Sequence, residues 1–202
     1  MRTCYTVKMD VIKDMIIKSR SVRRFYEEKE ISMDQLRELA DIARLTPSGA
    51  NRQPLKYILV CDKEMNKKVY ETIGWAGYLK DWEGPVPSER PAGYIIMLRD
   101  KSITKTMTVD EGIAGQSILL GATEMGLGGC FIANIKKAEL TQALDISEDY
   151  EVTLIIALGY PKEEVVIEKV NEDGDVKYWR DEHQVHHVPK RSLDDIILRE
   201  IS

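Results

Sequence analysis

Residues 46–54 read Thr-Pro-Ser-Gly-Ala-Asn-Arg-Gln-Pro and lie between a helical pattern and an apolar, strand-like run. Pro47 fixes its φ angle, and the glycine permits a tight backbone. Ser48, Asn51 and Gln53 carry hydroxyl and amide groups that donate and accept hydrogen bonds. Such a loop is suited to hold a polar ligand, although an ordinary turn between a helix and a strand uses the same residue types.

The segments on either side of this loop predict an α+β protein. The spacing of apolar residues predicts helices over residues 10–18, 32–45, 63–73, 110–125 and 136–144. Continuous β-prone runs of strand length predict strands at 57–61, 94–98 and 152–158. The helix at 110–125 carries apolar or small residues on nearly every side, so we expect it to be buried all round, with Gly126 ending it.

Chain length and composition predict a single domain over residues 1–202. The chain has 202 residues, of which 43% are hydrophobic, and this is enough to bury a substantial core. We expect the core to span residues 8–161. Residues 162–202 are polar and irregular and have too little apolar content for a core of their own. We expect this C-terminal tail to be extended and to wrap a partner subunit.

Charge and cysteine content exclude several classes of protein. Lys and Arg (29) nearly balance Asp and Glu (34), so the net charge of −5 gives no basic field for nucleic acid. The longest apolar stretch is too short to cross a membrane, and the N-terminus lacks a signal pattern. Three cysteines without C-x-x-C spacing argue against a disulfide framework or a structural zinc site. We therefore expect a cytoplasmic protein without a metal.

A basic motif lies upstream of the loop, where residues 19–25 read Ser-Arg-Ser-Val-Arg-Arg-Phe. Two or three of the guanidinium groups of Arg20, Arg23 and Arg24, with the hydroxyl of Ser21, can converge on a phosphate through charge-assisted hydrogen bonds. The alternative is a solvated basic turn that pairs with the glutamates of residues 27–30.

A glycine-rich motif follows the apolar helix, where residues 126–134 read Gly-Leu-Gly-Gly-Cys-Phe-Ile-Ala-Asn. It follows a helix rather than a strand and lacks the G-x-G-x-x-G spacing, which excludes a dinucleotide fingerprint. A helix end that leads into a buried strand accounts for the same residues. Cys130 is expected to be a small buried side chain rather than a nucleophile.

The basic motif, the loop at residues 46–54 and the glycine-rich motif, in this order along the chain, resemble those of the FMN-dependent nitroreductase family. The resemblance covers residues 12–161, with a matching basic pair at Lys190 and Arg191. It implies a nitroreductase-like α+β fold with a central mixed, mostly antiparallel sheet flanked by helices. It also implies a homodimer with two FMN sites at the interface.

The resemblance assigns a role to each part of the basic motif. Arg20 and Ser21 are expected to hold the FMN phosphate or ribityl chain, and Arg23 is expected to approach the pyrimidine edge of the flavin. Ser19 replaces the arginine that usually opens the family's motif, which weakens one phosphate contact. Lys190 and Arg191 are expected to supply the missing charge, unless they serve only as solubilising surface charge.

The other two motifs are expected to contact the flavin from two subunits. The loop residues Pro47, Ser48, Asn51 and Gln53 would reach the FMN that is bound mainly by the other subunit. The segment with Gly128, Gly129, Ile132 and Ala133 would bring backbone N–H groups close to the flavin N5.

The implied activity is NAD(P)H-dependent reduction with FMN as cofactor and a ping-pong mechanism, in which a nitroaromatic or quinone replaces the nicotinamide as small-molecule acceptor. One alternative is a reductive dehalogenase or flavin-fragmenting relative on the same fold. Another is a flavin-binding protein without turnover.

Two further groups of residues stay open at this point. Trp75, Tyr78 and Trp82 lie on a long loop and could stack on an aromatic substrate or serve as packing anchors. The histidines at 183, 186 and 187 would share a helical face, but no carboxylate or cysteine lies at matching spacing. We therefore expect a polar tail rather than a metal site there.

Overall fold

The computed structural model describes residues 6–201, with side chains from residue 11 onward. Its helices are α1 (Thr6–Lys18), α2 (Met33–Arg44), α3 (Lys63–Glu71), α4 (Asp110–Glu124), α5 (Lys137–Ala143) and α6 (Leu193–Ile196), with a short 3-10 turn, η1 (Gly49–Asn51). The five predicted helices are confirmed within a few residues.

The central sheet has the order β1-β2-β4-β3, with β1 (Leu55–Val60), β2 (Gly93–Asp100), β3 (Gly128–Ile132) and β4 (Tyr150–Gly159). The three predicted strands are confirmed, and β3 lies in the glycine-rich motif. Each of its pairings within the described chain is antiparallel, with Ile58 opposite Ile96 and Ile96 opposite Ile155. The parallel pairing implied by a mixed sheet lies instead in a second, smaller sheet.

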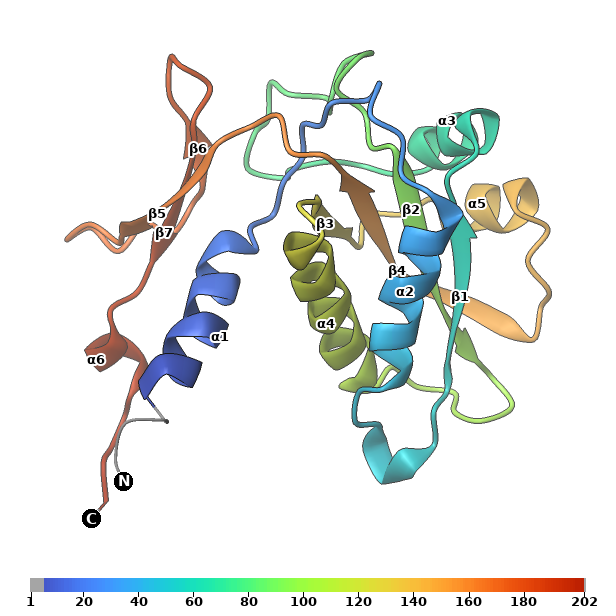
Figure 1. Cartoon of the computed structure of the whole chain (residues 1–202), viewed down its shortest axis with the longest axis horizontal. Helices are drawn as coiled ribbons and strands as arrows, with labels where there is room; N and C mark the ends of the chain where they lie inside the picture. Colours follow the sequence, from blue (N-terminus) through green and yellow to red (C-terminus); the bar gives the residue numbers. More distant parts are fainter. Residues whose placement is uncertain (1–5, 202) are drawn as a thin grey trace.

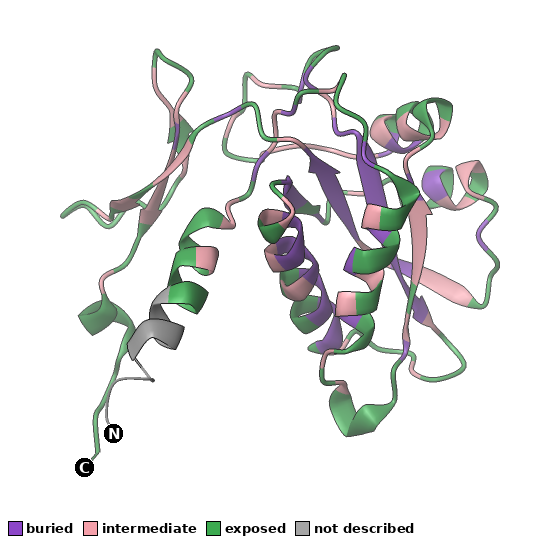
Figure 2. Cartoon of the chain, in the orientation of Figure 1, coloured by how far each residue is buried: buried purple, intermediate pink, exposed green. Residues whose placement is uncertain are grey.

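Helices cover both faces of the central sheet (Figure 1). Ile95 and Met97 of β2 pack with α2 and α4 on one face, whereas Tyr94 and Ile96 pack with α3 and α5 on the other. Alternate residues of a strand point to opposite faces, so a strand that is covered on both sides needs a continuous apolar run. Figure 2 shows this buried strand between the two helical layers.

Local sequence features explain where α2 and α4 begin and end. Ser32 and Gln35 form the capping box at the start of α2. Gly126 has a φ of 75°, which an L side chain adopts only with strain, and it follows the end of α4. Gly121 lets the two helices meet, because a Cβ atom there would lie 2.5 Å from Ile42 Cδ1.

The expectation that α4 is buried all round is wrong for the single chain. Ala114, Ile118 and Ala122 face the core, but Ile113 and Gln116 lie on an exposed face of the helix. The residue types on the two faces differ little, so composition alone could not distinguish them.

The C-terminal tail is more regular than predicted. It forms a sheet of order β5-β7-β6, with β5 (Val165–Lys169), β6 (Trp179–Arg180) and β7 (His186–Lys190). β5 and β7 are parallel, and β6 and β7 are antiparallel. These strands are short and their alternation is mixed with charged residues, so they gave no clear strand signal. Wrapping of a partner by the tail stays a prediction.

Helix α1 and the end of the tail project away from the central sheet (Figure 1). Val11, Ile12, Ile16 and Ile17 of α1 are between 46% and 64% exposed, which leaves an apolar helix face uncovered in the single chain. None of the helices in residues 6–201 combines the length and apolar character needed to cross a membrane.

Candidate functional site

The basic motif and the glycine-rich motif lie side by side. Ser21 forms a parallel bridge with Gly129, and the Val22 N–H donates to the Gly129 carbonyl at 3.0 Å. A Cβ atom at Gly129 would lie 2.5 Å from the Ala157 carbonyl oxygen, and one at Gly128 would lie 2.9 Å from Val22 Cγ2. Packing against the basic motif therefore explains the need for Gly128, and packing against β4 explains the need for Gly129, without a ligand.

A cavity of about 230 Å³ opens beside these two motifs. Its lining consists of Arg23, the Gly74–Gly77 stretch of the long loop, residues 130–134 at the end of β3, and Tyr178 of the tail. Ile132 and Ala133 therefore border it. Gly128, Gly129, Arg20 and Ser21 are not among its lining residues. The cavity thus joins the basic motif, β3, the long loop and the tail.

Arg23 is held on the cavity wall by several contacts. Its Nη1 donates to the Ser21 carbonyl at 3.2 Å and lies 3.4 Å from His186 Nε2. Its guanidinium carbon lies 5.0 Å from the centre of the Tyr178 ring, within the range of a cation–π contact. Its backbone N–H donates to the buried carboxylate of Glu163.

Glu163 also binds a second arginine, Arg180, which lies in the tail. Arg180 Nη2 donates to Glu163 Oε2 at 2.8 Å, and both side chains are less than 10% exposed. Burial lowers the pKa of Arg180, and the charge of Glu163 opposes this shift. The Arg180 guanidinium lies 4.3 Å above the Trp82 ring, so the tail is tied to the long loop.

Arg20 caps α1. Its Nη2 donates to the Ile16 carbonyl at 2.6 Å, and burial lowers the pKa of the guanidinium. The Nε atom is buried and has no hydrogen-bond partner within the part of the chain that the structure describes. Arg20 therefore has one buried N–H group that is not hydrogen-bonded to the described residues.

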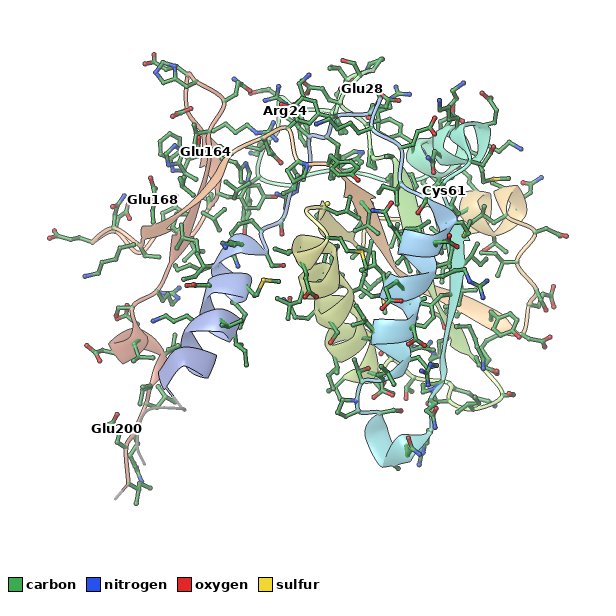
Figure 3. All side chains as sticks on the ribbon, in the orientation of Figure 1. Arg24, Glu28, Cys61, Glu164, Glu168 and Glu200 are labelled. Carbon is green, nitrogen blue, oxygen red and sulfur yellow. The ribbon has the colours of Figure 1, made fainter. Side chains whose placement is uncertain are left out.

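Arg24 is not free to bind a ligand. It donates from Nε and Nη2 to the two carboxylate oxygens of Glu89, at 2.6 and 2.7 Å, and Lys162 reaches the same carboxylate at 3.1 Å. Figure 3 shows Arg24 on the segment that crosses above the sheet. The predicted alternative of pairing with the glutamates of residues 27–30 was wrong for this arginine, because its partner comes from the long loop.

The loop at residues 46–54 is anchored by Asp110 at the start of α4. The Ser48 hydroxyl donates to Asp110 Oδ2 at 2.5 Å, and the Gly49 N–H donates to Oδ1 at 3.0 Å. Burial opposes ionisation of Asp110, but these bonds and one from Thr108 lower its pKa below the usual value. The Ser48 oxygen also accepts from the Gln53 N–H at 2.9 Å. Ser48 is thus engaged within its own loop.

The remaining polar groups of this loop face outward. Pro47, Asn51 and Gln53 are exposed, and Gln53 Nε2 donates to Asn51 Oδ1 at 3.1 Å. Ala50, Asn51 and Gln53 have φ angles of 51°, 53° and 52°, a left-handed conformation that costs free energy in residues other than glycine. The loop therefore presents amide groups on a strained backbone.

The loop at residues 46–54 and the cavity have no residue in common. The loop is bound to Asp110 at the start of α4, whereas the cavity is lined by Arg23, the Gly74–Gly77 stretch, residues 130–134 and Tyr178. Within one chain the loop residues therefore do not line the cavity at Arg23.

The three aromatic residues of the long loop have different surroundings. Trp75 lines the cavity and packs against Tyr70 and Trp82, with ring centroids 5.9 and 6.3 Å apart. Trp82 lies beneath Arg180 and is not part of the lining, so it is a packing anchor. Tyr78 is 54% exposed and its ring lies 5.0 Å from that of Tyr178.

The basic pair of the tail lies away from the cavity. Lys190 and Arg191 are exposed, and neither is among the residues that line it. Lys190 follows His186 by four strand positions, which is about 13 Å along β7. Within one chain the pair is therefore not brought to Arg23.

The histidines lie in the tail sheet and its turn, not on a helix. His187 binds Glu168 and, at 3.3 Å, Asp181, and it stacks on Trp179 at 4.1 Å. Burial alone would lower the pKa of His187, but the two carboxylates raise it above the usual value. His183 is exposed, and His186 is buried beside Arg23.

Sequence reasoning missed four residues of this region: Asp110, Glu163, Tyr178 and His186. An acidic residue at the first position of an apolar helix was a signal for Asp110, because carboxylates bind backbone N–H groups and stabilise helix N-termini. The other three come from a tail that the sequence analysis treated as irregular. Their contacts with Arg23 and Tyr78 join positions that lie at least 100 residues apart in the chain, and no local pattern reports such contacts.

Comparison with known proteins agrees with this arrangement. Residues 16–160 match the model of a family described as Nitroreductase family. A relative from Archaeoglobus fulgidus, named "Putative NADH dehydrogenase/NAD(P)H nitroreductase", is 30% identical over 77% of this chain and 88% of its own length. A relative from Thermotoga neapolitana, named iodotyrosine deiodinase, is 25% identical over 76% of this chain and 90% of its own.

A solved structure shares the fold. It is that of an FMN-dependent nitroreductase from Clostridium difficile, which superposes with a TM-score of 0.59 at 24% identity and covers 74% of this chain and 87% of that one. The family match spans most of the chain, including the basic motif, the loop, the glycine-rich motif and the central sheet. The chain therefore belongs to the nitroreductase family of oxidoreductases.

Proposed function

We propose that the protein is an FMN-dependent NAD(P)H oxidoreductase that reduces nitroaromatic, quinone or related small acceptors. The observation that carries this proposal is the cavity where Arg23, the end of β3 and the aromatic side chains of Trp75 and Tyr178 meet. The family match and the names of the relatives agree with it.

The residues present fit a flat, phosphorylated cofactor. Aromatic walls suit a planar ring system, since rings stack in offset geometry. Arg23 offers a guanidinium at the wall, and Arg20 holds a buried Nε donor that lacks a partner among the described residues. Lys190 and Arg191 add exposed positive charge for a phosphate, in this subunit or in its partner.

When bound, FMN supplies hydride acceptance from NAD(P)H and donation to the acceptor that replaces it, which gives ping-pong kinetics. We assign to Arg23 the role of stabilising negative charge at the pyrimidine edge of the reduced ring. The main-chain N–H groups of residues 130–134 that the β3–β4 pairing does not use would serve as donors to the flavin. No side chain is needed as acid, base or nucleophile. Burial raises the pKa of the Cys130 thiol to about 12, so this side chain stays protonated and inert.

We propose a homodimer in which each cavity is completed by the partner's loop at residues 46–54. Two observations support it. The loop does not line the cavity of its own chain, and its Asn51 and Gln53 amide groups are exposed. The exposed apolar side chains of α1, together with Ile113 of α4, are apolar surface that association would remove from water. An isologous two-fold interface would place each loop against the other subunit's cavity.

The single-domain extent of residues 1–202, the partner-wrapping tail and a cytoplasmic location remain part of this proposal. Residues 1–5 and 202 lie outside the described residues.

An anaerobic half-reaction screen tests the proposed activity. The purified protein is mixed first with NADH or NADPH, and loss of the flavin absorbance is followed. A panel of nitroaromatics and quinones is then added to the reduced protein. Bleaching by a nicotinamide, then recovery with an acceptor, is the expected result. Bleaching with no recovery would instead support the flavin-binding protein without turnover, and absence of bleaching would refute the proposed activity.

A reductive dehalogenase is the second candidate, because one relative is named iodotyrosine deiodinase. Tyr78, Lys80 and Glu83 are exposed on the long loop and could face a zwitterionic amino acid. Iodotyrosine therefore belongs in the acceptor panel. Iodide release faster than nitroaromatic or quinone reduction would favour this candidate over the first.

A further inference from the structure

His186 has an environment that a structural histidine does not require. It begins β7, is fully buried and lies with its ring 5.2 Å from that of Tyr178. Its Nε2 lies 3.4 Å from Arg23 Nη1. Arginine N–H groups only donate, so Nε2 must carry the lone pair and Nδ1 the hydrogen. Nδ1 is buried and has no hydrogen-bond partner among residues 11–201.

The surroundings keep this imidazole neutral. Burial and the nearby charges of Arg23, Arg180 and His187 lower the pKa of His186 to about 4. The carboxylate of Glu163 is in the same cluster, but it accepts from the Arg23 backbone and from Arg180. At neutral pH the Nε2 lone pair is therefore available to accept from Arg23. A buried N–H group without a hydrogen-bond partner costs free energy, so another contact of the His186 ring has to explain why a histidine lies here.

The contacts on Arg23 supply that reason. One amino group is fixed by the Ser21 carbonyl and by His186 Nε2, and one face of the guanidinium is covered by the Tyr178 ring. Arginine has five N–H donors in a rigid planar fork, so fixing one amino group and one face determines the direction of the rest. Arg23 also lines the cavity, where the remaining donors are available to a ligand.

We propose that His186 is a positioning residue, which acts with Tyr178 to hold the Arg23 guanidinium at the cavity as a fixed hydrogen-bond donor. The tail thus contributes to the site through the contacts of His186 and Tyr178 with Arg23. This inference rests on the proposed function, because it assigns Arg23 to the flavin. Without the His186 acceptor, Arg23 would distribute over several rotamers and contact the reduced ring less.

The test compares two substitutions of His186 with a matched substitution of its neighbour. His186→Phe keeps a ring of similar size without the acceptor, and His186→Gln restores an acceptor oxygen. His187→Phe is the control, because His187 also lies on β7 but contacts Glu168 and Asp181 instead of Arg23. The midpoint potential of bound FMN and the dissociation constant of oxidised FMN are measured for each.

We expect His186→Phe to weaken the binding of reduced FMN about tenfold relative to oxidised FMN, which for a two-electron couple lowers the potential by about 30 mV. His186→Gln and His187→Phe should keep the wild-type potential. Equal potentials in all three variants, or a loss that glutamine does not restore, would overturn the inference. If His186→Phe does not fold, Tyr178→Leu is compared with Tyr178→Phe, and only the leucine variant should lower the potential.

A crystal structure of His186→Phe without flavin separates this inference from the proposed function. We expect the Arg23 guanidinium to leave the face of Tyr178 in that variant. Arg23 found in its wild-type place would overturn the inference even if FMN binds. If the wild-type protein binds no FMN but Arg23 moves in the variant, the proposed function fails and the positioning role of His186 stands.

Discussion

Glu89 provides the sharpest test of how the segments around the cavity are held together. Its carboxylate accepts two hydrogen bonds from Arg24 and one from Lys162, and the residue is 8% exposed. It therefore joins the basic motif, the long loop and the start of the tail. The hydrogen bonds from Arg24 outweigh the effect of burial and, with Lys162, lower the pKa of Glu89 from 4.5 to about 2.

The free-energy change follows from that shift. A carboxyl whose pKa falls from 4.5 to about 2 on folding stabilises the native state by about 3 kcal/mol at neutral pH. The lowered pKa fixes the sign of the pH dependence. The contribution is complete above the unfolded pKa near 4.5 and is lost as the pH falls through the folded pKa near 2. The unfolding free energy of Glu89→Gln should therefore be about 3 kcal/mol lower than that of the wild type at pH 7. This difference should shrink as the pH falls from about 4.5 toward about 2.

Urea denaturation of both proteins at a series of pH values, at one fixed protein concentration, measures this gap. Glu30→Gln is the matched control, because Glu30 pairs with Lys63 at 2.7 Å but both side chains are exposed to more than 70%. The control should hardly change the unfolding free energy, since exposed ion pairs contribute little. Equal losses in the two variants, or a gap for Glu89→Gln that stays constant as the pH falls, would refute the reasoning.

Five further substitutions test the site, the packing and the assembly. Arg23→Ala should lower the flavin's potential and slow hydride uptake, because it removes a charge-assisted hydrogen bond of about 1.5–3 kcal/mol. Arg20→Ala should mainly weaken FMN binding. Stopped-flow reduction measures the first effect, and FMN titration measures the second. Gly129→Ala should lower the unfolding free energy by about 1–3 kcal/mol, because the new Cβ meets a backbone carbonyl at 2.5 Å; an unchanged urea midpoint would contradict this. Ile12→Asp should shift sedimentation toward the monomer, whereas Lys13→Asp on the same helix should not; equal shifts would argue against the apolar face of α1 as the interface.

The sequence was sufficient for most of the fold because apolar periodicity reports burial directly. β2 lies between two helical layers and reads as an unbroken apolar run, and α2 has both a capping box and an apolar face. β3 was recognised only as an alternative reading, since two glycines begin it. The tail sheet was missed because each of its strands spans five residues or fewer and alternates poorly.

The candidate site was predictable where residue type and order carry information. The basic and glycine-rich motifs were expected to meet at one ligand, and they lie side by side. The positions of Asp110 and His186 depend on contacts between segments far apart in the chain, which a single sequence does not report. The free side of α4 shows a related limit, because an apolar helix looks the same whether its own core or a second subunit covers it.

The measurement that tests the central claim most directly is the identity of the chromophore that the purified protein releases on denaturation. Mass spectrometry of the released compound, with its amount per chain, is sufficient. The proposed function predicts FMN, one per chain, because the cavity at Arg23 and the basic side chains suit a flat ring with a terminal phosphate. Release of FAD, or a folded protein that neither carries nor binds a flavin, would contradict the proposal.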